Sequence, residues 1–555
     1  MRIALSSINP VIGDFQKNIE QIKAGMARAR EAGCQLLILP ELVLSGSPPM
    51  SLLSRSSFLE AHDQAFARLL ATIGDMAVLC GVISRDNSTF GKGLYNSAVL
   101  MAEGKIQFVI HKHLLESFGS YREGDYFEKG EVYLPVPFQG RRLGITLGQE
   151  IIPEEDNHGL RDIHSPIADF HHNGGADLFI NLAATPFTKD EISSRFDRLS
   201  GICRKYQTPL LYVNQMGGQD SLLFDGQCLT FNSKGELSQS TPPFEEGMLI
   251  VGSEQPDAAS PGGEKHPRDL ECILRGIVTG IRDYVHKSGF SRVVIGLSGG
   301  IDSALTCAAA VRALGPENVL GAALPSEISS PESVADARQL AANLGISFEI
   351  IPIDRSLQTL KDTLAPLFQE ERDDITEANL QARIRGVLLM ALANKYNRLL
   401  LATGNKSEVA TGYCTLYGDT CGALAPLADV PKTMVYELAA LLNRKWGSGS
   451  GEIIPGSSLE KAPSAELIPG RQDLDDLPAY KILDGILEAW QEEKLSIAEI
   501  VDRGYDSSTV KDVIRRLDKN KFKRHQLPPG LRLTSRAFDF GTDLPVAGRC
   551  LPEYD

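Results

Sequence analysis

A glycine-containing turn at residues 298–303 (SGGIDS), between an apolar run and a helix, constrains the fold of this chain most strongly. The apolar run at 293–297 (VVIGL) predicts a buried strand, residues 303–314 predict a helix, and residues 319–324 predict a second strand. Strand, turn, helix and strand in this order form a βαβ unit of a parallel sheet. The C-terminal half is therefore predicted to be an α/β domain.

The same turn has the chemistry of a phosphate-binding loop. Gly299 and Gly300 allow a tight turn and a close approach of a ligand to the backbone. The helix N-terminus that follows offers unpaired N–H groups to a phosphate. Asp302 can hold Mg²⁺, and Ser298 and Ser303 can donate to phosphate oxygens. The alternative is a plain tight turn of a parallel sheet, and the loop is not a Walker A motif, because GxxxxGK[ST] does not occur.

The length of 555 residues predicts more than one domain, since single cores rarely grow past about 250–300 residues. Residues 253–268 are rich in Pro, Gly, Ser and charge, which is typical of a linker. We therefore expect domains at 1–252 and 269–555, with 253–268 between them. A second Gly/Ser-rich segment, at 446–463, is predicted to be a loop.

Composition excludes several classes of protein. The chain has 71 acidic and 56 Lys and Arg residues, a formal net charge of −15, which argues against a general nucleic-acid binder. Its nine cysteines form no CxxC pair or Cys/His cluster, so neither a zinc site nor a disulfide framework is indicated. Dispersed thiols fit a reducing cytosol. With no secretory signal and no apolar run of about 18 residues, we expect a cytoplasmic protein without a membrane segment.

Residues 298–303 resemble the loop of the N-type ATP pyrophosphatases, which adenylate a carboxyl or carbonyl group. Six further blocks follow, at 379–385 (NLQARIR), 401–408 (LATGNKSE), 417–419 (YGD), 429–432 (DVPK), 463–467 (PSAEL) and 523–526 (KRHQ). Together, in this order, the blocks closely resemble the synthetase domain of the NAD⁺ synthetases, over residues 270–538. The resemblance implies a Rossmann-like, adenine nucleotide alpha hydrolase-like parallel-sheet domain, and a homo-oligomer, either a dimer or larger.

It also implies a reaction and a site. ATP would adenylate the nicotinate carboxylate of deamido-NAD⁺ with release of pyrophosphate, and ammonia would displace AMP. The implied ATP-binding residues are Ser298, Gly299, Gly300, Asp302, Ser303 and Thr403. The implied Mg²⁺ ligands are Asp302 and Glu408. The residues implied to bind deamido-NAD⁺ are Asn379, Lys406, Asp419, Lys432 and Lys523.

The N-terminal half resembles the carbon–nitrogen hydrolase (nitrilase-like) domain, an α-β-β-α sandwich that releases ammonia from glutamine in glutamine-dependent NAD⁺ synthetases. Members use a Glu base, a Lys and a Cys nucleophile, and Glu41 in 39–41 (LPE) and Lys112 match the first two. Gly148 stands at the nucleophile position, so no thioester with glutamine can form there. We therefore expect an inactive glutaminase whose ammonia comes from solution or another protein, with Glu41 and Lys112 as remnants.

Other departures accompany the missing thiol. Positions where the family has a different residue are Glu116 (usually Pro), Phe118 (Tyr), Asp125 (Arg), Thr185 (Ser) and Glu191 (Lys). Cys228, where the family usually has Ser, is a conceivable relocated nucleophile, although an ordinary buried cysteine is the commoner role.

Two further hypotheses stay open. Glu327 and Ile328 replace a usual Arg-Tyr, Ile468 replaces a basic residue, and the tail at 538–543 lacks paired arginines. These losses of positive charge favour a divergent adenylating amide ligase that acts on another acid or amine. A non-catalytic nucleotide-binding or scaffold subunit is the third hypothesis, and the intact phosphate loop and metal ligands argue against it.

Overall fold

The structure is a computed structural model that describes residues 1–86, 91–118, 121–131, 133–151, 166–252, 269–368, 374–447, 452–464, 466–538 and 545–548. The chain divides into two compact units. The first comprises Met1–Gly217 and Leu223–Pro267, and the second comprises Gly218–Leu222 and Arg268–Asp555. The linker predicted at 253–268 lies outside the described residues. Among the described helices, none is both long and apolar enough to cross a membrane.

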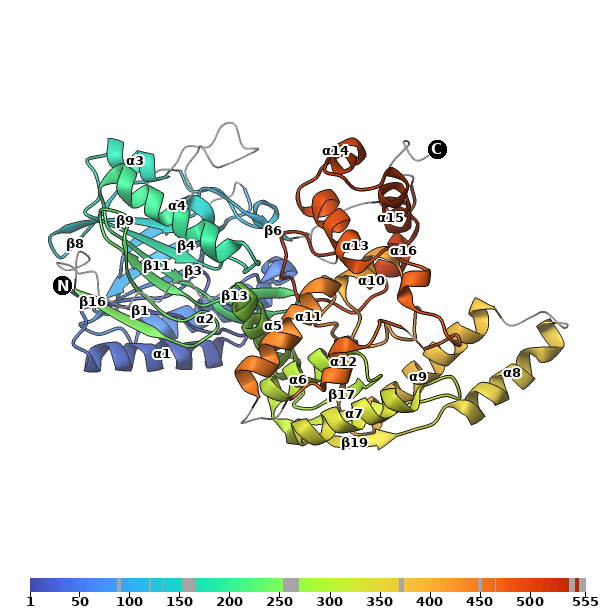
Figure 1. The fold of residues 1–555 in the computed structure, drawn as a ribbon. Coiled ribbons are helices and arrows are strands. Elements are labelled where there is room, and N and C mark those ends of the chain that lie inside the picture. Colours follow the sequence, from blue (N-terminus) through green and yellow to red (C-terminus); the bar gives the residue numbers. More distant parts are fainter. Residues whose placement is uncertain are drawn as a thin grey trace. The chain divides into compact units, whose positions relative to one another are not determined.

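The first unit is built on two six-stranded sheets (Figure 1). In spatial order the first sheet contains β16 (Met248–Gly252), β1 (Arg2–Ser6), β2 (Leu36–Ile38), β3 (Ala77–Arg85), β4 (Leu94–Ala102) and β5 (Lys105–His111). The second contains β15 (Leu237–Ser240), β14 (Cys228–Phe231), β11 (Leu210–Asn214), β10 (Leu178–Ala183), β9 (Arg141–Leu147) and β8 (Val136–Phe138). Shorter strands are β6 (Ser117–Phe118), β7 (Tyr121–Arg122), β12 (Met216–Gln219) and β13 (Leu222–Asp225).

Alternating apolar side chains explain the layers of this unit. Leu5 and Ile38 belong to a core shared by the two sheets, whereas Ala4 and Leu37, one residue away, belong to a core shared with helices. The helices of the unit are α1 (Phe15–Glu31), α2 (Ser56–Leu70), α3 (Pro166–His172) and α4 (Glu191–Tyr206). The first two pack in the core of the first sheet, and α3 and α4 pack against β9 and β14 of the second. This layering confirms the predicted α-β-β-α sandwich.

The second unit contains a four-stranded parallel sheet, as the βαβ pattern predicts (Figure 1). Its spatial order is β19 (Ser347–Ile350), β18 (Val319–Ala323), β17 (Val293–Gly296) and β20 (Leu399–Leu401). The helices that pack on the sheet or on one another around it are α5 (Asp269–Lys287), α6 (Ile301–Leu314), α7 (Pro331–Leu344), α8 (Asp354–Phe368), α9 (Ile375–Lys395) and α11 (Lys432–Trp446). The chain moves outward from β17 through β18 to β19 and then returns to the other side of β17 as β20, which makes the β17–β20 boundary a topological switch point.

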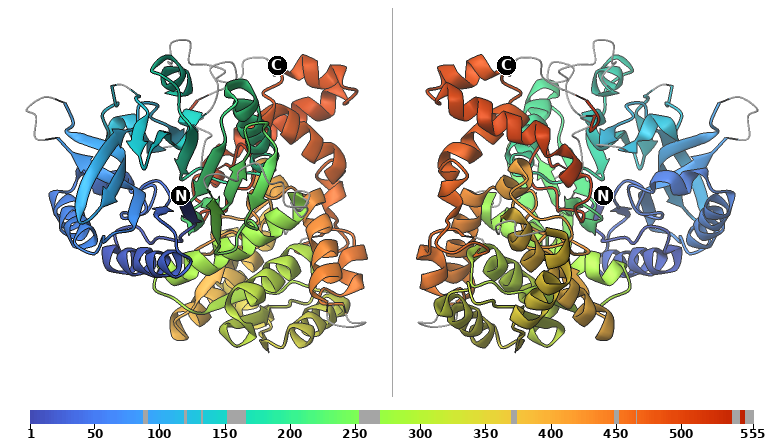
Figure 2. Two further views of the ribbon diagram at one scale, coloured as in Figure 1. Left: turned by 90° about the vertical axis from the view of Figure 1, so that its left-hand side faces the viewer. Right: turned by 90° about the vertical axis from the view of Figure 1, so that its right-hand side faces the viewer.

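The second unit also contains a separate helical group. It contains α10 (Lys406–Thr411), α13 (Tyr480–Leu487), α14 (Ile497–Asp502), α15 (Ser507–Lys519) and α16 (Lys521–Arg524), whereas α12 (Gly456–Glu460) packs against α6 and α11. Leu483, Ile500 and Val513 form its core together with Ala410 of α10. Figure 2 shows α13 to α16, in red and orange-red, gathered at one end of the second unit. The segment 446–463, predicted to be a loop, contains the short helix α12, so that prediction was wrong there.

Candidate active site

The loops that follow β17 and β20 meet at the switch point of the second sheet. In open α/β sheets, ligands bind outside the carboxyl ends of the strands at such a point. Residues 297–300 leave β17 and enter α6, and residues 402–405 leave β20 and enter α10. The two motifs predicted to bind ATP are therefore neighbours in space although about a hundred residues separate them.

The turn between β17 and α6 is held by serine hydroxyls and a close backbone contact. The Oγ atoms of Ser298 and Ser303 lie 3.2 Å apart, and Ser303 Oγ donates to the carbonyl oxygen of Gly300 at 3.0 Å. Gly299 has a φ of +80°, and a Cβ there would lie 2.3 Å from the backbone oxygen of Ser333. Position 299 therefore requires glycine on steric grounds.

The loop after β20 forms the facing wall. Asn405 caps α10, because its Oδ1 accepts from the Glu408 backbone N–H at 3.1 Å while Glu408 Oε2 accepts from the Asn405 N–H at 3.2 Å. The Asn405 Nδ2 also donates to Asp302 Oδ1 at 3.0 Å. One asparagine thus orients both of the carboxylates that the sequence predicts to bind metal.

A buried lysine lies between these carboxylates. The Nζ of Lys432 is 2.5 Å from Asp302 Oδ2 and 3.7 Å from Glu408 Oε1. Desolvation and the Asp302 charge raise the pKa of Glu408 to about 8. Burial by itself would lower the pKa of Lys432, but the Asp302 and Glu408 carboxylates outweigh it and raise that pKa. The two carboxylates therefore favour a cation between them.

This arrangement fits Mg²⁺, which proteins commonly bind through one or two carboxylates together with substrate phosphates. Within the described parts of the chain, no group of three or more His, Cys, Asp or Glu side chains could hold a metal ion by itself. Asp302 and Glu408 would supply the protein's share of the ligands.

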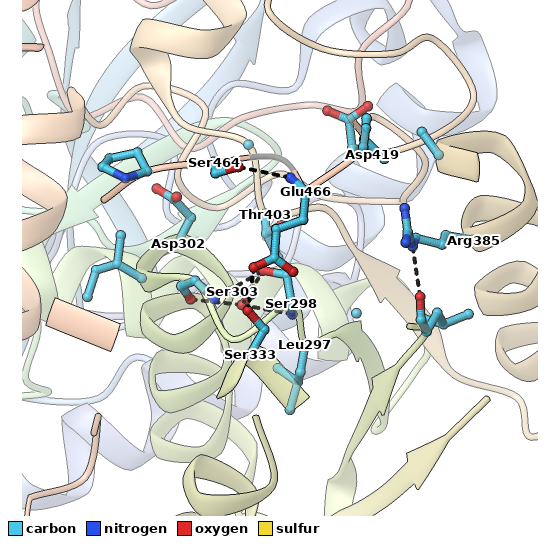
Figure 3. Close-up of a pocket in the computed structure, with 18 of the residues that line it drawn as sticks. Leu297, Ser298, Asp302, Ser303, Ser333, Arg385, Thr403, Asp419, Ser464 and Glu466 are labelled. Atoms are coloured by element: carbon cyan, nitrogen blue, oxygen red, sulfur yellow. Dashed lines mark hydrogen bonds between the residues drawn. The ribbon is translucent and has the colours of Figure 1, made fainter. Parts of the chain in front are cut away.

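Both loops line a cavity of about 290 Å³ (Figure 3). Of the residues predicted to bind ATP or metal, Ser298, Gly300, Asp302, Ser303, Thr403 and Glu408 line it. Its positive side chains are Arg385, Lys432 and Lys461, and Arg385 Nε donates to the carbonyl oxygen of Leu324 at 2.9 Å. Five carboxylates also line it, those of Asp302, Glu408, Asp419, Glu466 and Asp473, so a polyphosphate would bind here together with a metal cation.

The five residues predicted to bind deamido-NAD⁺ do not all reach this cavity. Asp419 and Lys432 line it, and burial raises the pKa of Asp419 to about 6. Asn379, on α9, accepts a hydrogen bond from the hydroxyl of Thr415 at 2.7 Å. Lys523 Nζ donates to the backbone oxygens of Gly412 and Cys414 at 2.7 and 2.8 Å. A role for these residues in binding deamido-NAD⁺ stays a prediction.

Lys406 is sealed in the interior of the second unit. Its side chain is 2 % exposed, and its Nζ lies 3.1 Å from Asp429 Oδ1 and 3.2 Å from Glu492 Oε1. The same nitrogen donates to the hydroxyl of Thr534 at 2.7 Å and to the backbone oxygen of Arg536 at 3.2 Å. These contacts hold the segment around Thr534 against α10. Lys406 does not line the cavity.

Sequence reasoning did not assign a role to a second charged cluster at the cavity. Glu466 Oε1 accepts from Lys461 Nζ at 2.6 Å and from the hydroxyls of Ser333 and Ser330 at 2.6 and 3.1 Å. Figure 3 shows Glu466 directed toward Ser298 and Ser333. The 463–467 block drew attention to Glu466, but Lys461 lies in the segment that was predicted to be a loop.

The first unit contains a separate charged cluster, which includes the amidase residues predicted from the resemblance. Lys112 is 1 % exposed, and its Nζ lies 2.7 Å from Glu41 Oε1, 2.8 Å from Glu116 Oε1 and 2.9 Å from Glu123 Oε2. The Asn96 Nδ2 donates to both Glu41 Oε1 and Glu123 Oε1, at 2.7 and 2.9 Å. The structure thus brings Glu41 and Lys112 into contact, and their role as amidase remnants stays a prediction.

Gly148 lies beside this pair, directly after β9 and at the start of a 3-10 helix (Gly148–Ile151). A Cβ at this position would lie 2.8 Å from Lys112 Nζ and 3.1 Å from Glu41 Oε2. Position 148 therefore directs any side chain at Glu41 and Lys112. Cys228 is fully buried in the core between the sheets, and burial raises the pKa of its thiol to about 12. This environment is that of a structural cysteine.

Comparison with known proteins finds a family match for each half of the chain. The family model for NAD synthase matches residues 273–527, and the carbon–nitrogen hydrolase model matches residues 2–260. A glutamine-dependent NAD(+) synthetase of Synechocystis sp. is 40% identical over 562 residues, covering 99% of both chains. The enzyme of the same name from Thermotoga maritima is 38% identical over 586 residues, again covering 99% of both.

Solved structures agree as well. A glutamine-dependent NAD⁺ synthetase of Acinetobacter baumannii in complex with adenosine diphosphate is 36% identical, with a TM-score of 0.77 over 97% of this chain and 96% of that one. A counterpart from Cytophaga hutchinsonii, 21% identical, shares the fold with a TM-score of 0.82 over 98% of this chain and 97% of that one. The chain therefore belongs to the glutamine-dependent NAD⁺ synthetase family, whose members are ligases that form a carbon–nitrogen bond.

Proposed function

We propose that this chain converts deamido-NAD⁺ to NAD⁺ with ATP and takes its nitrogen from ammonia, because its glutaminase half lacks a nucleophile. The observation that carries the proposal is Gly148, which puts no side chain at the position directed toward Glu41 and Lys112. The ligase half supports the first part of the proposal, since its phosphate loop, its carboxylates and its cations line one cavity. The full-length likeness to NAD⁺ synthetases supports the substrate class.

The ligase residues have separate tasks in this reaction. The backbone N–H groups at the start of α6, with the hydroxyls of Ser298 and Ser303, would hold the ATP phosphates. Asp302 and Glu408 would hold Mg²⁺, which neutralises phosphate charge and so makes pyrophosphate a better leaving group. Lys432 and Arg385 would offset the charge that develops on the phosphates during transfer.

The bond changes balance without a further co-reactant. A nicotinate carboxylate oxygen attacks the α-phosphorus of ATP, the bond to the bridging oxygen breaks, and pyrophosphate leaves. The acid becomes an acyl adenylate, in which AMP is a good leaving group. Ammonia then attacks the acyl carbon, the bond from that carbon to the AMP oxygen breaks, and the nitrogen loses a proton. The protein's contribution is positioning and charge neutralisation, since neither step needs a covalent bond to the enzyme.

The nitrogen source is the part of the proposal that can be tested most sharply. Removing the nucleophile of a hydrolase can lower kcat by about 10⁶. We expect NAD⁺ formation with ATP, Mg²⁺, deamido-NAD⁺ and ammonium chloride, and a rate with glutamine in ammonia-free buffer equal to that without any nitrogen source. NAD⁺ formation from glutamine alone would show that the proposal is wrong.

A divergent acid or amine specificity remains the second candidate. Glu327 is exposed, and neither it nor Ile468 lines the cavity. Pyrophosphate release measured with ATP, Mg²⁺ and a panel of carboxylic acids separates the candidates. Release with deamido-NAD⁺ supports the first proposal, and release only with another acid supports the second. ATP binding without release under any condition would favour a non-catalytic subunit.

A further inference from the structure

Gly148 has no side chain, and the space that a side chain would enter there is already occupied. A Cβ built there would lie 2.0 Å from the Glu116 Oε1, far inside the distance that real Cβ atoms keep from other atoms. Its φ of +54° is in the left-handed region, which adds a cost to any non-glycine residue. The volume in which a side chain at 148 would begin is therefore taken by a carboxylate from elsewhere in the chain.

That carboxylate is held in place from several directions. Glu116 Oε1 accepts from Lys112 Nζ at 2.8 Å and from the backbone N–H of Gln149 at 2.7 Å. The backbone of Glu116 pairs with Glu123, since its N–H donates to Glu123 Oε2 at 2.8 Å and its carbonyl accepts from the Glu123 N–H at 2.9 Å. The Glu116 side chain is 4 % exposed. It is therefore not a free end that moves aside at little cost.

Glu116 also changes what Lys112 can do. The Lys112 ammonium group has three carboxylate neighbours, from Glu41, Glu116 and Glu123, and it donates hydrogen bonds to Glu41 and Glu116. A carboxamide substrate would have to displace Glu116 both from Lys112 and from the Gln149 N–H. Burial raises the pKa of Glu116 to about 8, which is consistent with a cluster shielded from solvent.

We propose that Glu116 closes the amidase pocket from within, so that glycine at 148 and glutamate at 116 form one paired change that excludes a small carboxamide such as that of glutamine. The inference deepens the proposed loss of glutaminase activity and rests on it. It adds that restoring a thiol at position 148 alone does not reopen the pocket, because the carboxylate remains where the new side chain must begin.

The test uses the full-length chain in three variants. Gly148→Cys keeps Glu116, Gly148→Cys/Glu116→Gln keeps the volume of that side chain but removes its charge, and Gly148→Cys/Glu116→Ala removes both. All three carry the same backbone strain at position 148, so differences among them report on residue 116. Alkylation of the introduced thiol by iodoacetamide is followed by peptide mass spectrometry, and the Tm is measured for each variant.

We expect Gly148→Cys and Gly148→Cys/Glu116→Gln to lose about 5 °C or more in Tm, because their cores are overpacked. Alkylation at position 148 should be at least about tenfold faster in Gly148→Cys/Glu116→Ala, because thiol reactivity follows access. Equal alkylation rates in Gly148→Cys and Gly148→Cys/Glu116→Ala would overturn the inference. An alkylation rate in Gly148→Cys/Glu116→Gln as fast as that in Gly148→Cys/Glu116→Ala would also overturn it, because the volume of the side chain at 116 would then not be what limits access.

Variants of Glu116 in the otherwise native chain keep the inference testable if Gly148→Cys does not fold. Acetamide should raise the Tm of Glu116→Ala but not that of the wild type or of Glu116→Gln, and an equal response in all three would overturn the inference. The proposed function fails separately: wild-type NAD⁺ formation from glutamine alone overturns it, whatever the alkylation rates. If the wild type cannot use glutamine but Gly148→Cys is alkylated as fast as Gly148→Cys/Glu116→Ala, the proposed function stands and only the proposal that Glu116 closes the pocket is wrong.

Discussion

Each unit buries a lysine among carboxylates, but the two clusters differ in the space beside the lysine. In the second unit, Lys432 lies next to Asp302 and lines a cavity of about 290 Å³. In the first unit, Lys112 is in contact with three carboxylates, and the position of a missing side chain at Gly148 is taken by Glu116. Similar charges thus make a candidate active site in one unit and a closed ion cluster in the other. What separates them is access, because a charged group acts on a substrate only where a substrate fits.

The largest effect on stability is expected at Lys406, a second lysine of the second unit that is buried away from the cavity. Lys406→Met would leave the Asp429 and Glu492 carboxylates buried without their ammonium partner, which should lower the free energy of unfolding of the second unit by about 3–5 kcal/mol. Both tryptophans of the chain, Trp446 and Trp490, lie in this unit, so tryptophan fluorescence in urea reports on it.

Thr534→Val is the matched control, since it removes one hydroxyl that bonds Lys406 and should cost about 1 kcal/mol. Unchanged stability of Lys406→Met, together with a raised KM for deamido-NAD⁺, would contradict the sealed arrangement. That result would instead support the substrate contact predicted from the sequence.

The open cluster should respond in activity. Asp302→Asn removes the carboxylate that Lys432 and Asn405 share, so kcat/KM for ATP in the ammonia-dependent reaction should fall by about 10²–10³. Glu116→Gln removes a carboxylate from the closed cluster and should change that rate by less than about twofold, since it lies outside the ligase cavity. Equal losses of kcat/KM in Asp302→Asn and Glu116→Gln, measured by steady-state kinetics, would show that the two clusters do not differ in their role in the ligase reaction.

The closed cluster should instead respond to pH. Burial raises the pKa of Glu116 from an ordinary 4.5 to about 8 and raises that of Glu41, so the folded unit binds more protons than the unfolded chain between these values. Its stability should therefore fall as pH rises from about 5 to 9, by on the order of 2 kcal/mol. The Lys112 charge lowers the pKa of Glu116 and so moderates this fall, whereas the Glu41 and Glu123 carboxylates raise that pKa and enlarge it.

Pulse proteolysis in urea, following fragments of the first unit at pH 5, 7 and 9, measures this dependence. Glu116→Gln should flatten it, because the amide does not titrate. A first unit that becomes more stable between pH 5 and 9 would show that the cluster is not shielded as the structure indicates.

The smallest effect is expected at Cys228. Cys228→Ala should cost the first unit about 1 kcal/mol through the small volume lost from the core between the sheets. It should leave the response to ammonia and to glutamine unchanged, as measured by NAD⁺ formation. If the wild type shows any glutamine-dependent rate that this variant abolishes, Cys228 is a relocated nucleophile after all.

Local patterns in the sequence predicted the elements that carry chemistry. The apolar run before residues 298–303 predicted β17 and α6, because a strand, a glycine turn and a helix start are all set by residues next to one another. The motif blocks named Asp302, Glu408 and Lys432, and the fold brings these three residues to one cavity. The pattern likewise named Glu41 and Lys112, which the fold brings into contact.

Partners chosen by packing could not be predicted in this way. Lys406 sits in a motif block between Asn405 and Glu408, yet its ammonium group turns to Asp429 and to Thr534, which are distant in sequence. Lys461, in the segment predicted to be a loop, pairs with Glu466 at the cavity. A side chain's direction depends on the backbone that passes beside it, and no local pattern contains that information.

The sequence by itself determined that this chain has two halves of different chemistry, and its resemblance to the amidases predicts that Gly148 stands at the nucleophile position of one of them. It did so because strand, turn and helix signals, and the types of residue in a motif, are local properties. Only the tertiary structure decided which charged groups remain open to a ligand. Glu116, in the segment after β5, fills the space at Gly148, directly after β9, and such a long-range contact exists only in the folded unit.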